Sequence, residues 1–166
     1  MEAQQAQLMS AYNRAMNIQL YAVCAELSDS ERRRDRQAFF RSIQGTLNHL
    51  LLADRLWLGS FIGKPVSFGA LDEELYASFD ELRRERAVTD ANICDWAAEL
   101  SGADLNAPFM SGDREMGFPL WVVVSHFFNH QTHHRGQVTA LLSQQGLDYG
   151  TIDLPWVPGV VDVIRD

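Results

Sequence analysis

Apolar residues recur at helical spacing in four long stretches of the chain, and short polar segments rich in glycine or proline separate these stretches. Positions three and four apart lie on one side of an α-helix, so the periodicity predicts four amphipathic helices. We expect them at residues 4–27, 35–62, 78–102 and 119–146. The apolar face of each helix must be buried, which predicts an all-α four-helix bundle.

Residues that interrupt helical hydrogen bonding mark the ends of these helices. Gly63-Lys64-Pro65 ends the second helix, because proline has no N–H to continue the ladder. Pro119 suits the first turn of the last helix, and Gly146 suits the left-handed position after its end.

The remaining segments lack helical periodicity. Residues 107–118 form a small irregular segment before the last helix, where Ser111-Gly112-Asp113 predicts a hairpin turn. We expect one short turn at residues 71–76 and an irregular tail over residues 147–166, packed on the bundle. The length of 166 residues predicts a single domain covering residues 1–166.

Charge and composition exclude several classes of function. The net charge is −8, whereas nucleic-acid binding needs a basic face, so we expect no DNA or RNA partner. The basic run at residues 32–36 is short and contains Asp35, which favours a solvated segment. No apolar run is long enough for a membrane span and no signal peptide is recognisable, so we expect a cytoplasmic protein. We expect Cys24 and Cys94 to be reduced and buried.

The five histidines are the main candidates for chemistry. Four of them, His126, His130, His133 and His134, share one side of the last predicted helix, and His49 lies in the second. Two imidazoles four residues apart can reach one ion, so His126/His130 and His130/His134 both qualify. Clustered histidines repel one another when protonated, whereas neutral imidazole is a good donor to divalent metals.

Two ligands make a weak site, and helical bundles build metal sites from facing helices, so His49 is the natural third ligand. The alternative is a set of core histidines whose hydrogen bonds are satisfied within the protein. The histidines lack the Glu of a helical zinc protease motif and the Glu-x-x-His repeats of a di-iron site, which favours a single metal ion.

Two segments resemble the motifs of one known family. The segment 126–137, His-Phe-Phe-Asn-His-Gln-Thr-His-His-Arg-Gly-Gln, resembles the signature of DinB-type proteins. The segment 39–57, which contains Gly45-Thr46-Leu47-Asn48-His49, is similar to their second-helix motif. The resemblance extends over residues 12–154 and implies a DinB/YfiT-like four-helix bundle. One departure is Gln44, where close relatives often carry histidine.

The resemblance further implies a three-histidine metal site formed by His49, His130 and His134. His126 and His133 match positions that are not usually ligands, and we assign them supporting roles by hydrogen bonding or packing. The resemblance does not fix the metal. Zn²⁺ and Ni²⁺ both suit imidazole, and we expect one divalent ion per chain.

Three histidine ligands leave a coordination position open, which is typical of a catalytic site. Some relatives use low-molecular-weight thiols, so the leading expectation is a metal-dependent enzyme, a thiol-dependent transferase or isomerase acting on a small molecule. Hydrolysis by metal-bound water and a non-catalytic, damage-inducible metal-binding stress protein are the alternatives. A homodimer is also possible. Candidates for orienting ligands or substrate are Asn48, Asp54, Asn129 and Arg135, although an interhelical ion pair explains Asp54 and Arg135 equally well.

Overall fold

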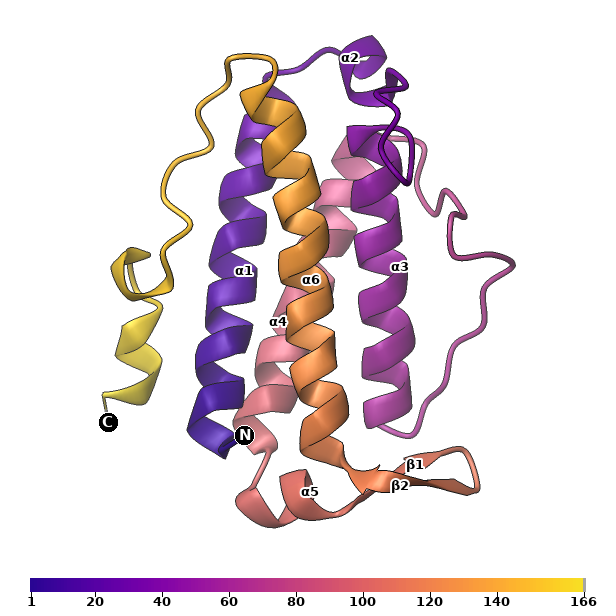
Figure 1. Cartoon of the computed structure of the whole chain (residues 1–166), viewed down its shortest axis with the longest axis vertical. Helices are drawn as coiled ribbons and strands as arrows, with labels where there is room; N and C mark the ends of the chain where they lie inside the picture. Colours follow the sequence, from indigo (N-terminus) through magenta and orange to yellow (C-terminus); the bar gives the residue numbers. More distant parts are fainter. Residues whose placement is uncertain (166) are drawn as a thin grey trace.

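Helices dominate the computed structural model, which describes residues 1–165. Four long helices run side by side, α1 (Ala3–Ala25), α3 (Ile43–Phe61), α4 (Phe79–Glu99) and α6 (Leu120–Ser143) (Figure 1). Both α1 and α3 pack against α4 and against α6, so the four helices enclose a common core. The prediction of an all-α four-helix bundle is confirmed.

Short elements connect and flank the bundle. Helix α2 (Asp29–Arg33) precedes α3, and α5 (Gly102–Asn106) precedes a hairpin of β1 (Pro108–Ser111) and β2 (Arg114–Pro119). Gly112 occupies the predicted hairpin turn with a φ of 60°. The tail contains two short 3₁₀ segments, η1 (Leu154–Trp156) and η2 (Val161–Ile164), and η2 packs on α1. The predicted tail reaches residue 166, which lies outside the described residues.

The start of the second long helix differs from the prediction. Helix α3 begins at Ile43 rather than at residue 35, because Gln37 and Arg41 adopt φ angles of 59° and 65°, which a right-handed helix does not allow. The Ser42 hydroxyl accepts a hydrogen bond from the N–H of Gly45 and caps the helix. Phe39 fits the apolar spacing of the predicted helix over residues 35–62, but it is 82% exposed on the loop before α3.

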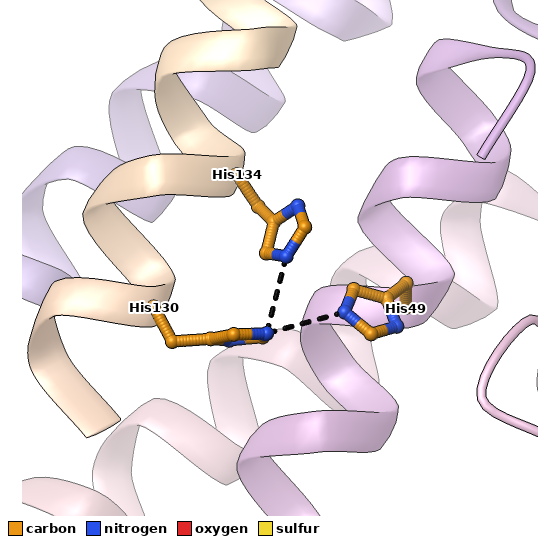
Figure 2. Close-up of side chains that lie close together, drawn as sticks. All are labelled: His49, His130 and His134. Atoms are coloured by element: carbon orange, nitrogen blue, oxygen red, sulfur yellow. Dashed lines mark hydrogen bonds between the residues drawn. The ribbon is translucent and has the colours of Figure 1, made fainter. Parts of the chain in front are cut away.

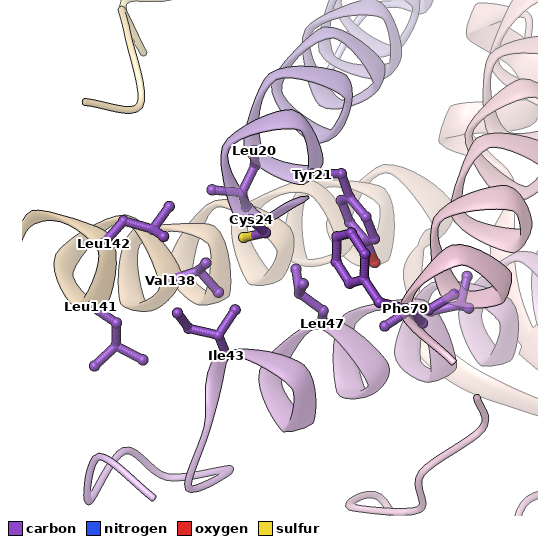
Figure 3. Close-up of a cluster of buried hydrophobic side chains, with 11 residues drawn as sticks. Leu20, Tyr21, Cys24, Ile43, Leu47, Phe79, Val138, Leu141 and Leu142 are labelled. Atoms are coloured by element: carbon purple, nitrogen blue, oxygen red, sulfur yellow. The ribbon is translucent and has the colours of Figure 1, made fainter. Parts of the chain in front are cut away.

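The core has an apolar cluster toward each end of the bundle and polar residues between them. Figure 3 shows one cluster, which includes Leu20, Ile43 and Leu142, and Phe127 belongs to the other. Side chains from all four long helices form the central polar layer, and all of them are buried. This layer consists of Asn13, Asn17, Asp54, Arg86, Asp90, Gln131 and Arg135.

Two further expectations from the sequence concern membrane-spanning helices and the two cysteines. Among residues 1–165, no helix combines the length and the hydropathy that crossing a bilayer requires. Both cysteines are free, but only Cys24 is buried, while Cys94 is half-buried. Burial raises the pKa of the Cys24 thiol to about 12, so this thiol is inert at neutral pH.

Candidate metal centre

Three of the five histidines converge between α3 and α6. His49 projects from α3 toward His130 and His134, which lie one turn apart on α6 (Figure 2). The Nε2 atom of His130 lies 3.3 Å from Nε2 of His49 and 3.1 Å from Nε2 of His134. One ligand atom from each ring lies within 4.8 Å of the other two, so the group could hold a metal ion.

These separations agree with shared coordination of one ion. Histidine nitrogens bind zinc at about 2.0–2.1 Å, so two nitrogens at neighbouring corners of a tetrahedron lie about 3.3–3.4 Å apart. The two measured Nε2–Nε2 distances, 3.3 and 3.1 Å, are close to this value. The ring nitrogens are therefore placed where they could share one ion.

Hydrogen bonds on the far side of two rings fix which nitrogen faces the centre. Nδ1 of His49 lies 2.8 Å from the carbonyl oxygen of Leu71, which can only accept, so Nδ1 carries the proton. Nδ1 of His134 lies 2.8 Å from Oε1 of Gln137 and donates in the same way. Both Nε2 atoms are left with lone pairs directed at the common centre, as in most metal-ligating histidines.

The electrostatics keep the three rings neutral. Burial, followed by the nearby charges of His134 and three other histidines, lowers the pKa of His130 to about 4. Burial also lowers the pKa of His49 and of His134. Nδ1 of His130 is buried without a hydrogen-bond partner among the described residues. At neutral pH three lone pairs can therefore face one point without competition from protons.

The side chain of Phe40, a residue within the second predicted helix, covers part of the histidine group. The Phe40 ring stacks on His49, with centroids 3.8 Å apart, and its centroid lies 5.5 Å from that of His134. Phe40 belongs to the loop before α3, where the left-handed backbone of Arg41 reverses the chain. A Cβ atom on Gly45 would lie 2.3 Å from the carbonyl oxygen of Phe40, so only glycine permits this approach.

The two other histidines lie beside the group but outside it. His126 is exposed, and its ring centroid lies 5.4 Å from that of Trp57. His133 is exposed as well, and its Nε2 lies 3.2 Å from Nε2 of Gln137, the residue that also orients His134. The supporting roles of both histidines at a metal centre stay a prediction.

Asn48 is buried beside His49 and holds the segment that follows α3. Its Oδ1 accepts from the N–H of Tyr76, and its Nδ2 donates to the carbonyl of Tyr76. The side-chain amide of Gln44 also donates to this carbonyl, as expected for a residue that does not contact the metal. Asn48 therefore anchors the same connection that presents the Leu71 carbonyl to His49.

Asp54, Arg135 and Asn129 do not lie among the three histidines. Asp54 forms a buried ion pair of 2.5 Å with Arg86 of α4, and burial raises its pKa. Arg135 is also buried, and it donates to Oδ1 of Asn13 on α1 rather than pairing with Asp54. The Asn129 side chain is exposed and makes no hydrogen bond within residues 1–165, so its role stays a prediction.

Comparisons with known proteins found a family, a curated relative and a solved structure that resemble this chain. The family model described as the DinB family matches residues 1–160. The chain is 30% identical over 157 residues to Protein DinB of Bacillus subtilis (strain 168), an alignment that covers 84% of this chain and 88% of the relative. It is also similar to the crystal structure of a DinB-like protein from Bacillus cereus ATCC 10987, with a TM-score of 0.59 and 19% identity, covering 82% and 89% of the two chains.

Proposed function

Because this chain belongs to the DinB family, we propose that it binds one divalent metal ion through His49, His130 and His134 and acts as a metal-dependent enzyme on a small molecule. Zn²⁺ and Ni²⁺ are the proposed ions, since both suit imidazole ligands. The observation that carries the proposal is the pair of fixed tautomers: the Nδ1 protons of His49 and His134 are held by Leu71 and Gln137.

A site of this kind favours an anion in its open position. The three imidazoles are neutral, so they do not offset the charge of a divalent cation, which would lower the pKa of a bound thiol or water. The resemblance to DinB-type proteins, some of which use low-molecular-weight thiols, makes thiol chemistry the leading reaction class, with such a thiol attacking a small electrophile and displacing its leaving group. The ligand residues contribute by holding their Nε2 atoms in place without reorganisation.

A cleft near the group is large enough for a small substrate. It has a volume of about 290 Å³ and is lined by Phe40, which stacks on His49, and by Asn48, although none of the three histidines lines it. The same cleft is lined by charged residues of both signs, which suit a polar substrate: Arg33, Asp35, Arg41, Asp72 and Glu74. Phe40 stacks on one face of His49 and shields that face of the imidazole from water.

Substitution with Co²⁺ tests the proposal. Adding 2-mercaptoethanol to the cobalt-loaded protein is expected to produce a thiolate-to-cobalt absorption band, and the His130→Ala variant is expected to lack it. The His133→Ala variant is the matched control and should retain the band. The zinc-loaded protein should then consume the thiol faster when 1-chloro-2,4-dinitrobenzene is present.

The two alternative functions predict different results. A hydrolase turns over 4-nitrophenyl acetate without any thiol, and the rate depends on the metal. A metal-binding stress protein without catalysis shows neither reaction. The thiol proposal is wrong if the cobalt spectrum is unchanged by the thiol while the metal stays bound.

A further inference from the structure

Arg135 is a buried cation without a carboxylate partner of its own. Its side chain extends from α6 toward α1, where it donates to Oδ1 of Asn13 and lies 3.4 Å from Oγ1 of Thr132. Its guanidinium carbon lies 5.6 Å from the centre of the Tyr12 ring. Within residues 1–165, no carboxylate oxygen lies within 4.0 Å of its nitrogens, and Nε makes no hydrogen bond.

The neighbouring carboxylates are engaged elsewhere in the central polar layer. Oδ2 of Asp54 and Oδ1 of Asp90 lie 2.5 and 2.9 Å from the guanidinium of Arg86. Asp90 also accepts from Asn13, whose other amide atom accepts from Arg135. The polar layer therefore fixes the position of Arg135 while leaving one edge of its guanidinium unpaired. Burial lowers the pKa of Arg135 to about 10, which still leaves it charged at neutral pH.

Arg135 lines a cavity between α1, α6 and the tail. The cavity has a volume of about 120 Å³, which is room for about four water molecules or for an organic acid of similar size. The rest of its lining is mostly apolar, and it includes Met16, Leu20 and Ile152. The tail covers part of it, since the Tyr12 hydroxyl donates to the carbonyl of Ile152 over 2.6 Å, and its rim reaches solvent at the exposed residues Gly136 and Ile152.

We propose that this cavity binds a short-chain monocarboxylate, with its carboxylate on Arg135 and its alkyl chain against Met16, Leu20 and Ile152. A guanidinium donates well to a carboxylate, and the interaction is stronger at a buried guanidinium such as that of Arg135 than at the surface. The apolar walls favour an alkyl chain over a sulfate or phosphate ion. This site is separate from the three histidines, because its lining comes from α1, α6 and the tail and includes no residue of α3.

Titration of the full chain with butyrate at constant ionic strength tests the proposal. The readout is the side-chain N–H resonance of Arg135 Nε, assigned through bonds in the ¹⁵N-labelled protein. We expect butyrate to shift this resonance saturably, with millimolar or tighter affinity, while butyramide of the same shape leaves it unchanged. Equal shifts with butyramide would show that no charge pairing occurs and would overturn the proposal.

A blocking variant separates this cavity from the metal centre, where a carboxylate could also bind. Gly136 is exposed at the rim of the cavity, and a Cβ atom there would meet nothing within 4 Å, so Gly136→Leu adds a bulky side chain to the lining without a clash at Cβ. We expect Gly136→Leu to abolish the butyrate-dependent shift and the control Gly136→Ala to retain it. A shift that persists in Gly136→Leu, or that never saturates in the unmodified protein, would contradict the proposal.

Discussion

The Phe40 ring lies nearly parallel to the His49 imidazole, with the two planes 18° apart. One face of this proposed ligand is therefore covered by an aromatic side chain, while its Nε2 remains directed at His130. The contact joins a loop with left-handed backbone at Arg41 to the first turns of α3. Left-handed conformations of non-glycine residues are often retained at functional sites, which fits a loop that shapes the metal centre.

Gly45→Ala is expected to destabilise the protein by about 1–3 kcal/mol, because the added Cβ would overlap the carbonyl oxygen of Phe40. Urea denaturation of the metal-free protein measures this loss. The control is Gly136→Ala, also within a helix, where a Cβ meets nothing within 4 Å and stability should rise by up to about 1 kcal/mol. Equal stability of the Gly45→Ala variant and the unmodified protein would show that the loop does not need this close approach.

Gln137→Ala is expected to weaken metal binding by about 10–100-fold, because Oε1 of Gln137 holds the Nδ1 proton of His134. Without this acceptor the His134 ring can rotate and change tautomer. Competition with a chromophoric chelator measures the affinity. Asn129→Ala on the same helix is the control and should keep the original affinity, since its side chain is exposed. An unchanged affinity in Gln137→Ala would mean that the hydrogen bond does not orient the ligand.

The histidine group makes the metal-free protein sensitive to acid. In the unfolded chain a histidine takes up a proton near its ordinary pKa of 6.5, whereas the folded protein holds the pKa of His130 at about 4. Between about pH 6.5 and pH 4 the unfolded state therefore binds more protons, and the free energy of unfolding falls as the pH falls. Above about pH 6.5 the contribution of neutral His130 to the free energy of unfolding is complete and no longer depends on pH.

Urea denaturation at pH 7.5 and pH 5 in the presence of a chelator measures this effect. We expect His130→Gln to lose less stability over this range than the unmodified protein. His133→Gln, which changes an exposed neighbour, should lose as much stability as the unmodified protein. The explanation would be wrong if His130→Gln and His133→Gln lost equal amounts of stability between pH 7.5 and pH 5.

Asp54→Ala is expected to cost about 3–5 kcal/mol, because it breaks a buried ion pair and leaves Arg86 poorly compensated. The folded variant should still bind one equivalent of metal, since Asp54 does not contact the three histidines. Glu85→Ala is the control, because it removes a partly exposed ion pair with Arg55, for which at most about 1 kcal/mol is expected. Loss of metal from folded Asp54→Ala would instead indicate a role in the centre.

Much of the fold follows from the hydrophobic periodicity, and the main error has a local cause. The pattern predicts the four long helices because each helix buries one face in the bundle, and this burial determines which positions are apolar. It does not reveal the loop before Ile43, since Phe39 and Phe40 continue the apolar spacing and the charged residues before them suit a helix. Only the left-handed φ angles at Gln37 and Arg41 stop the helix there, and neither residue type signals this conformation.

The candidate site could be predicted in part. Histidines at helical spacing, together with the family resemblance, indicate His49, His130 and His134, which the structure brings together. The two residues that orient these histidines were not predicted from the sequence. Leu71 acts through its backbone carbonyl, so its side chain gives no signal. Gln137 lies three residues after His134 on the same helix, a spacing that could have identified it.

The most direct test of the central claim is the metal content of purified variants. Elemental analysis of the unmodified protein, loaded with Zn²⁺ and passed through a desalting column, should give one equivalent per chain. Single alanine variants at His49, His130 and His134 should each retain far less than one equivalent, while His126→Ala and His133→Ala should retain one. Full occupancy in the first three variants, or loss of metal in the last two, would contradict the three-histidine centre.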